Sequence, residues 1–221
     1  MSNNIPIMTL DGPAGAGKGT VSRAIAKTLG WQYLDSGAIY RSLAIAVQDA
    51  GVLLDDIGGI VDIANKMDLR FGSGEAPSVF LYGQAITDRI TTETCGHITS
   101  KIAANGLVRQ ALLQKQREFC RFPGLVADGR DMGTVVFPEA KYKVYLTASA
   151  EERAKRRFKQ LKEKGIDVSL MGLAKEIEER DRRDMERSVA PLKMADGAVL
   201  VDSSDMRIDE VIDRCLGLLA A

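Results

Sequence analysis

One segment near the start of the chain has the residue types and the spacing that hold a phosphate chain. It lies between a short apolar run and a stretch with helical spacing, and it carries glycines, a lysine and a threonine. The glycines let the backbone curl so that successive N–H groups point inward, and the helix start favours anions. The lysine adds a point charge near the last two phosphates. The segment matches a P-loop. We predict that a nucleoside triphosphate binds to Gly12, Pro13, Ala14, Gly15, Ala16, Gly17, Lys18, Gly19 and Thr20.

One position departs from the usual P-loop pattern. Most P-loops carry Ser or Thr where this chain has Gly19, and that hydroxyl binds magnesium. We expect Thr20 to bind phosphate and Mg²⁺ to be held mainly by the nucleotide and by water. No protein ligand is assigned to the metal, and Thr20, Asp128 and water remain the alternatives. The motif does not identify the phosphate acceptor, because kinases, ATPases and GTPase switches share it.

Phosphoryl transfer depends on positioning and on positive charge around the moving group, so arginines outside the P-loop are informative. They occur in four groups. In the first, Ser36 is predicted to cap a helix that starts near Gly37. Tyr40 and Arg41 then lie one turn in, near the C-terminal edge of a sheet, where open α/β folds bind ligands. A capped helix with a surface arginine is the plainer alternative.

The second group, Asp128-Gly129-Arg130-Asp131, follows a short apolar strand. A carboxylate at a strand end beside a P-loop is suited to orient magnesium or water, which is the expected role of Asp128. Arg130 and Asp131 would project into the same cleft. A polar turn is the alternative.

The third group is a basic helix from Ser149 to Lys164, with seven basic residues among 151–164. Arg153 and Arg157 are four residues apart and share a helix face. This pattern predicts a mobile lid that brings both arginines onto the triphosphate. A solvated charged helix is the alternative.

The fourth group lies in the second half of a predicted long helix, 169–187. Arg180, Asp184 and Arg187 follow the spacing i, i+4 and i+7, so they share a face. Two cations with a carboxylate between them suit an anionic ligand that carries hydroxyls, such as a nucleotide. Salt bridges on an exposed helix are the alternative.

The composition excludes several other classes of protein. The chain has 221 residues, with 30 basic and 30 acidic residues and a formal charge of zero. This balance argues against nucleic acid and membrane surfaces as partners. The scattered Cys95, Cys120 and Cys215 favour free thiols, and the start shows no targeting pattern. We expect a cytoplasmic protein, and His97, the single histidine, to be structural.

Short apolar runs alternate with stretches of helical spacing, and they predict the strands and helices that position these groups. Strands are predicted at 5–10, 31–34, 124–128, 142–146 and 198–201, with helices at 18–29, 39–50, 92–104, 106–121, 149–164, 169–187 and 208–218. This order predicts parallel βαβ units. Residues 67–71 and 78–82 predict a hairpin around 72–77, within an insert at about 60–90.

The motifs resemble those of bacterial-type cytidylate kinases, which are nucleoside-monophosphate kinases. The resemblance rests on 11–20, 35–41, the stretch Ala127 to Pro138 that contains Asp-Gly-Arg-Asp-Met-Gly-Thr, and 179–184. It implies an α/β P-loop three-layer sandwich with a central five-stranded parallel sheet, in a single domain over 1–221. The core would comprise 1–35, 105–148 and 168–221, the monophosphate-binding lobe about 36–104, and the lid about 149–167.

The resemblance also implies an activity, transfer of the γ-phosphoryl group of ATP to CMP or dCMP with Mg²⁺, in a monomer. Lys18, Arg130, Arg153 and Arg157 would be catalytic. The residues implied to bind CMP are Ser36, Tyr40, Arg41, Ser100, Arg109, Asp128, Arg130, Asp131, Arg180, Asp184 and Arg187. Among them, Ser100, Arg109, Asp131 and Arg187 would read the cytosine, while Arg180 and Asp184 would hold the sugar.

Two other functions remain open at this point. One is a small P-loop kinase for a sugar or a shikimate-like alcohol, which would need a carboxylate base such as Asp35. The other is a nucleotide-operated switch or ATPase. Neither accounts for all four arginine groups.

Overall fold

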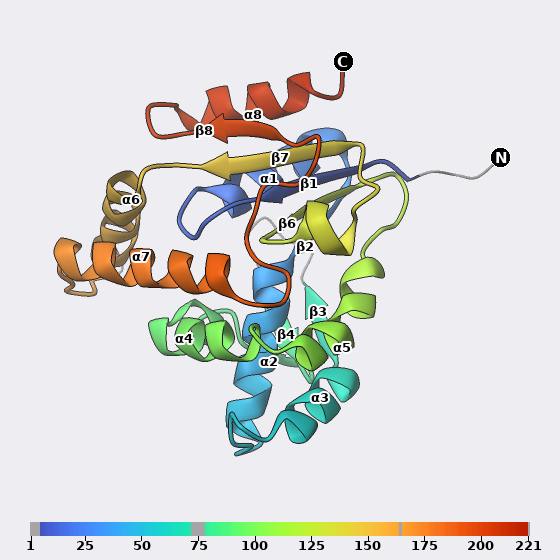
Figure 1. Ribbon diagram of the computed structural model, residues 1–221, viewed down its shortest axis with the longest axis vertical. Coiled ribbons are helices and arrows are strands. Elements are labelled where there is room, and N and C mark those ends of the chain that lie inside the picture. Colours follow the sequence, from blue (N-terminus) through green and yellow to red (C-terminus); the bar gives the residue numbers. More distant parts are fainter. Residues whose placement is uncertain (1–4, 72–77, 164, 221) are drawn as a thin grey trace. The chain divides into compact units, whose positions relative to one another are not determined.

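Five short strands, drawn from widely separated parts of the chain, form one parallel sheet. They are β1 (Ile7–Asp11), β2 (Gln32–Asp35), β6 (Leu125–Gly129), β7 (Tyr142–Thr147) and β8 (Val199–Asp202). Their order across the sheet is β2-β6-β1-β7-β8 (Figure 1). β1 pairs in parallel with β6 and β7, and β7 pairs in parallel with β8. The predicted α/β class with a central five-stranded parallel sheet is therefore confirmed.

The computed structural model describes residues 5–71, 78–163 and 165–220. The chain divides into two compact units, one formed by Met1–Leu34 with Phe119–Ala221 and the other by Asp35–Glu118. The first, called unit 1 below, contains the P-loop and most of the parallel sheet. The second is called unit 2.

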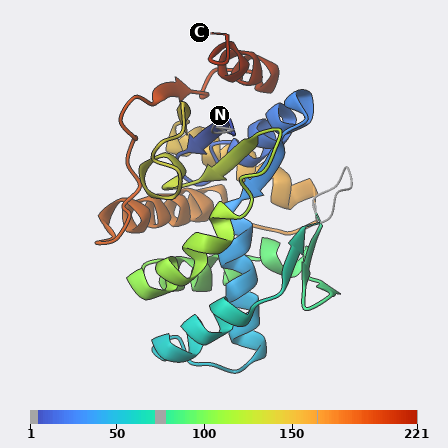
Figure 2. The same ribbon diagram turned by 90° about the vertical axis from the view of Figure 1, so that its right-hand side faces the viewer.

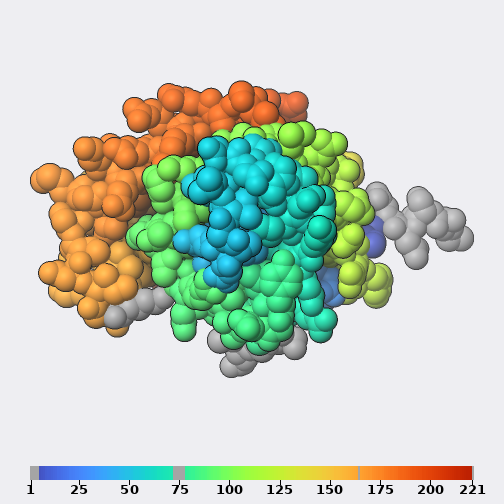
Figure 3. Space-filling model, turned by 90° about the horizontal axis from the view of Figure 1, so that it is seen from below, coloured from blue at the N-terminus to red at the C-terminus, as the bar shows by residue number. Residues whose placement is uncertain are grey.

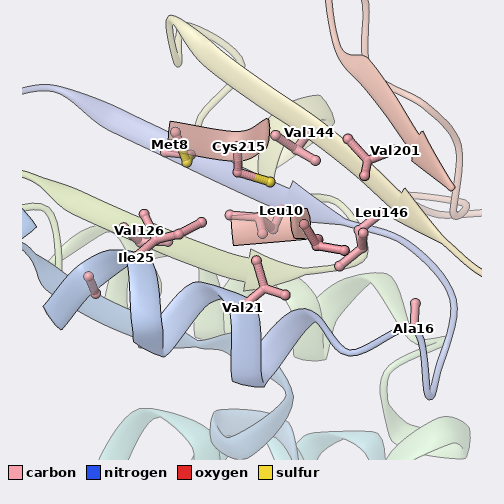
Figure 4. Packing of buried hydrophobic residues seen from close by; sticks show 12 residues of the cluster. Met8, Leu10, Ala16, Val21, Ile25, Val126, Val144, Leu146, Val201 and Cys215 are labelled. Atoms are coloured by element: carbon pink, nitrogen blue, oxygen red, sulfur yellow. The ribbon is translucent and has the colours of Figure 1, made fainter. Parts of the chain in front are cut away.

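The core of unit 1 lies on the face of the sheet where α1 (Lys18–Leu29) and α8 (Ile208–Gly217) pack. Met8 and Leu10 alternate along β1 toward this core, as the period of two in a strand requires (Figure 4). The other buried members of this cluster are Ala16, Val21, Ile25, Ala26, Val126, Val144, Leu146, Val201, Val211 and Cys215.

The opposite face of β1 carries polar side chains and packs against a single wide helical turn, η2 (Met132–Val136). Gly133 lies in this turn, where a β-carbon would be 2.9 Å from Thr9 Oγ1 and 3.2 Å from Ala195 Cβ. The close approach therefore requires glycine. It brings the turn that follows Asp131 down onto the strand that leads into the P-loop.

Two helices complete unit 1. α6 (Ala150–Glu163) begins after Ser149, whose Oγ accepts a hydrogen bond from the Glu152 N–H at 3.2 Å, and α7 (Leu170–Glu186) begins after the cap Ser169. The two helices pack on each other. Both were predicted from the sequence, and Lys164, the predicted end of the first, lies outside the described residues.

Unit 2 is built mainly from helices (Figure 2). Helix α2 (Ser36–Asp49) packs against α3 (Ile57–Lys66) and α4 (Glu93–Ile102), and α5 (Gly106–Arg117) packs on α3. A short turn, η1 (Arg89–Thr91), precedes α4. In Figure 3 the α2–α3 segment of this unit appears in blue to cyan.

A small antiparallel sheet completes unit 2. Its strands are β3 (Leu69–Phe71), β4 (Val79–Leu81) and β5 (Gln84–Ala85), in that order. Phe71 pairs with Val79, which confirms the predicted antiparallel pairing. The connecting residues 72–77, predicted as the hairpin loop, lie outside the described residues.

Three details of unit 2 differ from the sequence predictions. Helix α3 was not predicted, because Gly58 and Gly59 in its first turn weaken the helical pattern. The two-residue β5 was also not predicted. The cap of α2 is Asp35, whose Oδ1 accepts from the Ala38 N–H at 2.8 Å, and Ser36 is the first residue of the helix. The prediction of Ser36 as the cap was therefore wrong.

The predicted division into core, lobe and lid remains a prediction. By contacts, α5 groups with unit 2, whereas the sequence prediction placed it with the core. None of the helices that the structure describes combines the length and the apolar character needed to cross a membrane.

Candidate active site

The P-loop joins β1 to α1 and has a backbone that only glycine adopts easily. Gly12, Gly15 and Gly17 have φ angles of 150°, 78° and 91°. A β-carbon on Gly12 would collide with the carbonyl oxygen of Leu146 in β7. Gly17 is the N-cap of α1 and makes no side-chain cap. The first N–H groups of this helix therefore suit an anion.

Lys18 is buried in the loop that it is predicted to serve. Its Nζ donates to the Pro13 carbonyl at 2.8 Å, which ties the ammonium across the loop. Burial, followed by the nearby Arg130 cation, lowers the lysine pKa to about 7, although Asp128 and Asp11 act in the opposite direction. A bound triphosphate would favour the charged form of this lysine.

Asp11 connects the P-loop strand to the turn that carries the second arginine group. Its Oδ1 accepts from the Met132 N–H at 2.8 Å and its Oδ2 accepts from the Gly133 N–H at 2.7 Å. Burial raises the pKa of this carboxyl to about 6, against the effect of both hydrogen bonds. Asp11 thus holds the start of η2 beside the end of β1.

The end of β6 and one face of α7 meet in a group of buried charges. Arg130 Nε lies 2.9 Å from Asp184 Oδ2, and Arg130 Nη1 donates to the Gly129 carbonyl at 3.1 Å. Arg187 Nη2 lies 4.0 Å from Asp131 Oδ1, and these two side chains are 6% and 4% exposed. The predicted second and fourth groups are therefore brought together. The side chains of Asp131 and Arg187 are buried, and those of Arg130 and Asp184 are partly buried.

The pKa values in this group reflect its mixed charge. Burial acts to raise the pKa of Asp184, but Arg130, Arg180 and Arg187 outweigh it and hold the pKa below its usual value. Burial acts to lower the pKa of Arg130, but the carboxylates of Asp184, Asp128 and Asp181 together outweigh it and raise the value. Asp184 therefore stays ionised and Arg130 stays charged at neutral pH.

Asp128 occupies the end of β6, next to the lysine of the P-loop. Its carboxylate is buried, it acts electrostatically on Lys18, and its Oδ2 accepts a hydrogen bond from the Tyr33 hydroxyl at 3.1 Å. Magnesium prefers oxygen ligands and is usually held by one or two carboxylates together with substrate phosphates. A buried carboxylate beside a phosphate-binding loop fits that ion.

The predicted lid arginines divide into different environments. Arg153 is buried: its Nη1 lies 2.6 Å from Asp181 Oδ2 and donates to the Ala14 carbonyl at 3.0 Å, and its Nε donates to the Ala148 carbonyl. This side chain therefore supports the P-loop backbone from outside. Arg157 is half-buried one turn further along α6.

Unit 2 holds the remaining predicted residues, and these cluster on α2 and α5. Ser36 Oγ donates to Gln116 Oε1 at 2.7 Å, and Arg41 Nη1 donates to the Ile90 carbonyl at 3.3 Å. The guanidinium carbon of Arg109 lies 5.4 Å from the centre of the Tyr40 ring.

Arg109 is also fixed by a hydrogen bond from Nη1 to the Ala103 carbonyl at 3.0 Å. The N-cap Asn105 sets the start of its helix, α5. Ser100 is half-buried on α4.

The structure adds five residues that were given no role from the sequence. Asp11 begins the motif at 11–20, and Arg156 is one of the basic residues of the predicted helix 149–164. Arg156 donates to both Oγ and the carbonyl of Ser203. The other three hold predicted site residues through contacts between distant segments, and they are Tyr33, Gln116 and Asp181. Asp11, Arg156 and Asp181 lie in segments that the sequence analysis singled out, whereas Tyr33 and Gln116 had no local signal.

A P-loop on a parallel sheet, with buried arginines at the adjoining strand end, defines a P-loop phosphotransferase. The model of the cytidylate kinase family, described as "Cytidylate kinase", matches residues 8–220. The chain belongs to the cytidylate kinase family.

Two similar cytidylate kinases support the same family over the full length. A cytidylate kinase from Methylococcus capsulatus is 59% identical over 219 residues, covering 99% of both chains. One from Colwellia psychrerythraea is 54% identical, covering 98% of this chain and 96% of the relative. A solved shikimate kinase from Acinetobacter baumannii aligns over 98% of this chain and 94% of its own, with a TM-score of 0.46 and 17% identity.

Proposed function

We propose that this protein transfers the γ-phosphoryl group of ATP to CMP or dCMP, giving ADP and CDP or dCDP. Within unit 1, the observation that carries this proposal is the buried group formed by Arg130, Asp131, Asp184 and Arg187 beside the P-loop. A simple ATPase has no need for this group, whereas a second phosphorylated ligand would use its cations for phosphate and its carboxylates for amine and hydroxyl donors.

Phosphoryl transfer depends on positioning the reacting groups more than on a covalent bond between substrate and enzyme. In phosphoryl transfer the charge spreads over the equatorial oxygens of the moving group, and donors placed beforehand stabilise it. P-loop N–H groups and Lys18 would hold the donor phosphates, and Arg130 would neutralise the acceptor phosphate. The acceptor is already an anion at neutral pH, so the reaction needs no base to activate a hydroxyl.

The lid arginines are proposed to act on the triphosphate once ATP is bound. Arg153 would either keep supporting the Ala14 carbonyl or exchange it for a phosphate oxygen when α6 moves. Arg157, on the same face, would approach the triphosphate directly. Cations of this kind contribute roughly 10³- to 10⁵-fold in rate in related phosphoryl transfers.

Base recognition is proposed to centre on Asp131 in unit 1. Its carboxylate can accept from the exocyclic amine of cytosine, which uracil lacks. Arg180 and Asp184 are proposed to hold the sugar. For unit 2, Ser36, Tyr40 and Arg41 are proposed for the CMP phosphate, and Ser100 and Arg109 for acceptor atoms of the base.

Magnesium is proposed as the companion of ATP, held mainly by the phosphates and water with Asp128 nearby. When bound, the ion neutralises charge on the phosphates and polarises the bond that breaks. A monomer and a cytoplasmic location are proposed as well.

A coupled assay of ADP formation, with one acceptor at a time, tests the function. CMP and dCMP should give strong turnover, and UMP, AMP, GMP and shikimate should give little. ATP turnover without any acceptor would instead indicate a switch or an ATPase, and turnover only with shikimate would mean that the arginine groups were misinterpreted. The variant Lys18→Met, which removes the loop charge, serves as the inactive control.

A further inference from the structure

Polar side chains surround the position of Gly19 and leave little space for a side chain there. A β-carbon on Gly19 would lie 3.3 Å from Asp128 Oδ2, 3.3 Å from an Arg23 guanidinium nitrogen and 3.6 Å from the Tyr33 hydroxyl. The two 3.3 Å distances are tight, so Asp128 and Arg23 would have to shift by a few tenths of an ångström, whereas 3.6 Å is an ordinary contact. The space is filled by side chains from three different elements, namely α1, β2 and β6.

Among these side chains, Tyr33 supplies a hydroxyl to the carboxylate. β2 lies beside β6 in the sheet, so the ends of the two strands bring Tyr33 and Asp128 together. The Tyr33 hydroxyl donates to Asp128 Oδ2 at 3.1 Å, and the Arg23 guanidinium carbon lies 5.9 Å from the centre of the Tyr33 ring. The ring packs at the edge of the apolar cluster, which limits its movement.

In most P-loops the hydroxyl at the position of Gly19 is a magnesium ligand next to the nucleotide phosphates. In this chain the Tyr33 hydroxyl lies beside the position of Gly19 and donates to the Asp128 carboxylate. We infer that Tyr33 is a positioning residue that fixes the Asp128 carboxylate for Mg²⁺-ATP and so compensates for the hydroxyl that Gly19 lacks. This inference rests on the proposed use of Mg²⁺-ATP by the same site.

The variant Tyr33→Phe tests the inference, because it removes only the hydroxyl. The dissociation constant of ATP is measured by calorimetry with Mg²⁺ and again in EDTA without metal. Removing a residue that orients a metal-site ligand typically weakens metal binding by about 10-fold or more, so Mg²⁺-ATP should bind roughly 10-fold more weakly. Binding of metal-free ATP should stay close to that of the wild type.

Tyr142→Phe is the matched control. Tyr142 also packs at the edge of the same apolar cluster, on β7, and its hydroxyl has no part in the proposed site. This variant should leave both dissociation constants unchanged. Thermal unfolding of both variants separates a general loss of stability from a loss at the site. Equal weakening of ATP with and without Mg²⁺ in Tyr33→Phe, or no weakening at all, would overturn the inference.

A second comparison uses Gly19→Ser. In the wild-type background the added side chain meets Asp128, Arg23 and the Tyr33 hydroxyl, so Mg²⁺-ATP binding should weaken. In the Tyr33→Phe background the serine hydroxyl can replace the missing tyrosine hydroxyl beside Asp128, and it should restore part of the lost Mg²⁺-ATP affinity. The same effect of Gly19→Ser in both backgrounds would contradict the inference, because two independent sites should add.

The two proposals fail in different ways. If the wild-type protein forms no CDP from ATP and CMP, the proposed function is wrong. If it forms CDP while Tyr33→Phe binds Mg²⁺-ATP like the wild type, only the positioning role of Tyr33 is wrong.

Discussion

At the scale of single residues, the nucleotide site of unit 1 consists of buried charges that depend on one another. Lys18, Asp11 and Asp184 all have pKa values displaced from those of exposed groups. Burial is the largest cause for Lys18 and Asp11; for Asp184 burial acts to raise the pKa, but the neighbouring arginines outweigh it and lower the value. Such displaced values are common where a protein must bind or move charge. Two predictions follow from individual side chains.

The first concerns Asp131 and the choice of base. In Asp131→Asn the side chain gains a donor that faces the cytosine amine and no longer repels the uracil carbonyl. One mismatched buried pair costs about 1–3 kcal/mol, so the ratio of kcat/KM for CMP to that for UMP should fall by roughly 10-fold or more. Asp196→Asn, an exposed substitution in unit 1, is the control. An unchanged ratio in Asp131→Asn would remove this residue from base recognition.

The second concerns the proton on Lys18. Its pKa of about 7 lies below the usual 10.5, so at pH 8 much of the free protein carries a neutral lysine. An anionic triphosphate favours the ammonium, and ATP binding should therefore take up protons. Calorimetry at pH 8 in buffers with different ionisation enthalpies measures this uptake. Lys18→Arg, whose guanidinium stays charged, should show less uptake. Equal uptake in both proteins would contradict the prediction.

The same pKa has a consequence for folding. Between about pH 7 and 10.5 the unfolded chain holds a proton on Lys18 that the folded protein has released. Stability rises with pH wherever the unfolded state binds more protons, so this residue contributes an increase in unfolding free energy across that window.

At the scale of elements, one ion pair links α6, α7 and the P-loop. Arg153 of α6 pairs with Asp181 of α7 and donates to the Ala14 carbonyl in the loop. Gly15 lies against the same side chain, since a β-carbon there would be 3.2 Å from Arg153 Cβ. The helices that follow β7 therefore help to hold the shape of the phosphate-binding loop.

Breaking this pair should be costly. Asp181→Asn leaves the buried Arg153 cation without its counter-charge, and such a loss typically destabilises a protein by about 3–5 kcal/mol. Urea unfolding followed by circular dichroism measures the change. The double variant Arg153→Met/Asp181→Leu should recover most of the stability but weaken ATP binding, because the Ala14 carbonyl loses its donor. A single variant as stable as the wild type would contradict this account.

At the scale of the whole molecule, the two units each bury their own apolar residues, and each unit contains at least one cysteine thiol. Cys95 of unit 2 and Cys215 of unit 1 are buried, while Cys120 is half-buried, and none of the three forms a disulfide. Burial raises the pKa of Cys215 to about 11 and also raises the pKa of Cys120, next to Glu139. Thiolates should therefore be scarce in the folded protein at neutral pH.

Titration with a thiol-reactive disulfide reagent tests this distribution. At pH 7 one thiol should react slowly, and this reaction should disappear in Cys120→Ser. The other two should react only when denaturant unfolds the protein. Rapid reaction of two or three thiols in the native protein would show that one of the units opens readily.

Much of the fold could be predicted from the sequence, because local patterns specify local structure. The apolar runs predicted the strands of the parallel sheet, and the glycine spacing predicted the P-loop. The i, i+4 spacing of Arg180 and Asp184 falls within α7, whereas Arg187, predicted on the same helix, follows it as an extended C-cap. Where local signals were weak or ambiguous, prediction failed. The glycines of α3 hid a helix, and two adjacent cap candidates led to Ser36 where the structure uses Asp35.

The amino-acid sequence by itself determined the type of fold, the phosphate-binding loop and the family to which the chain belongs, since each depends on residues close together in the chain. Only the tertiary structure decided the strand order, the hydrogen bonds of Asp11 to η2, the bond of Tyr33 to Asp128, and the inward place of Arg153. The physical reason is that these contacts join residues far apart in sequence. Packing of the sheet and its helices brings them together, and no periodicity along the chain encodes them.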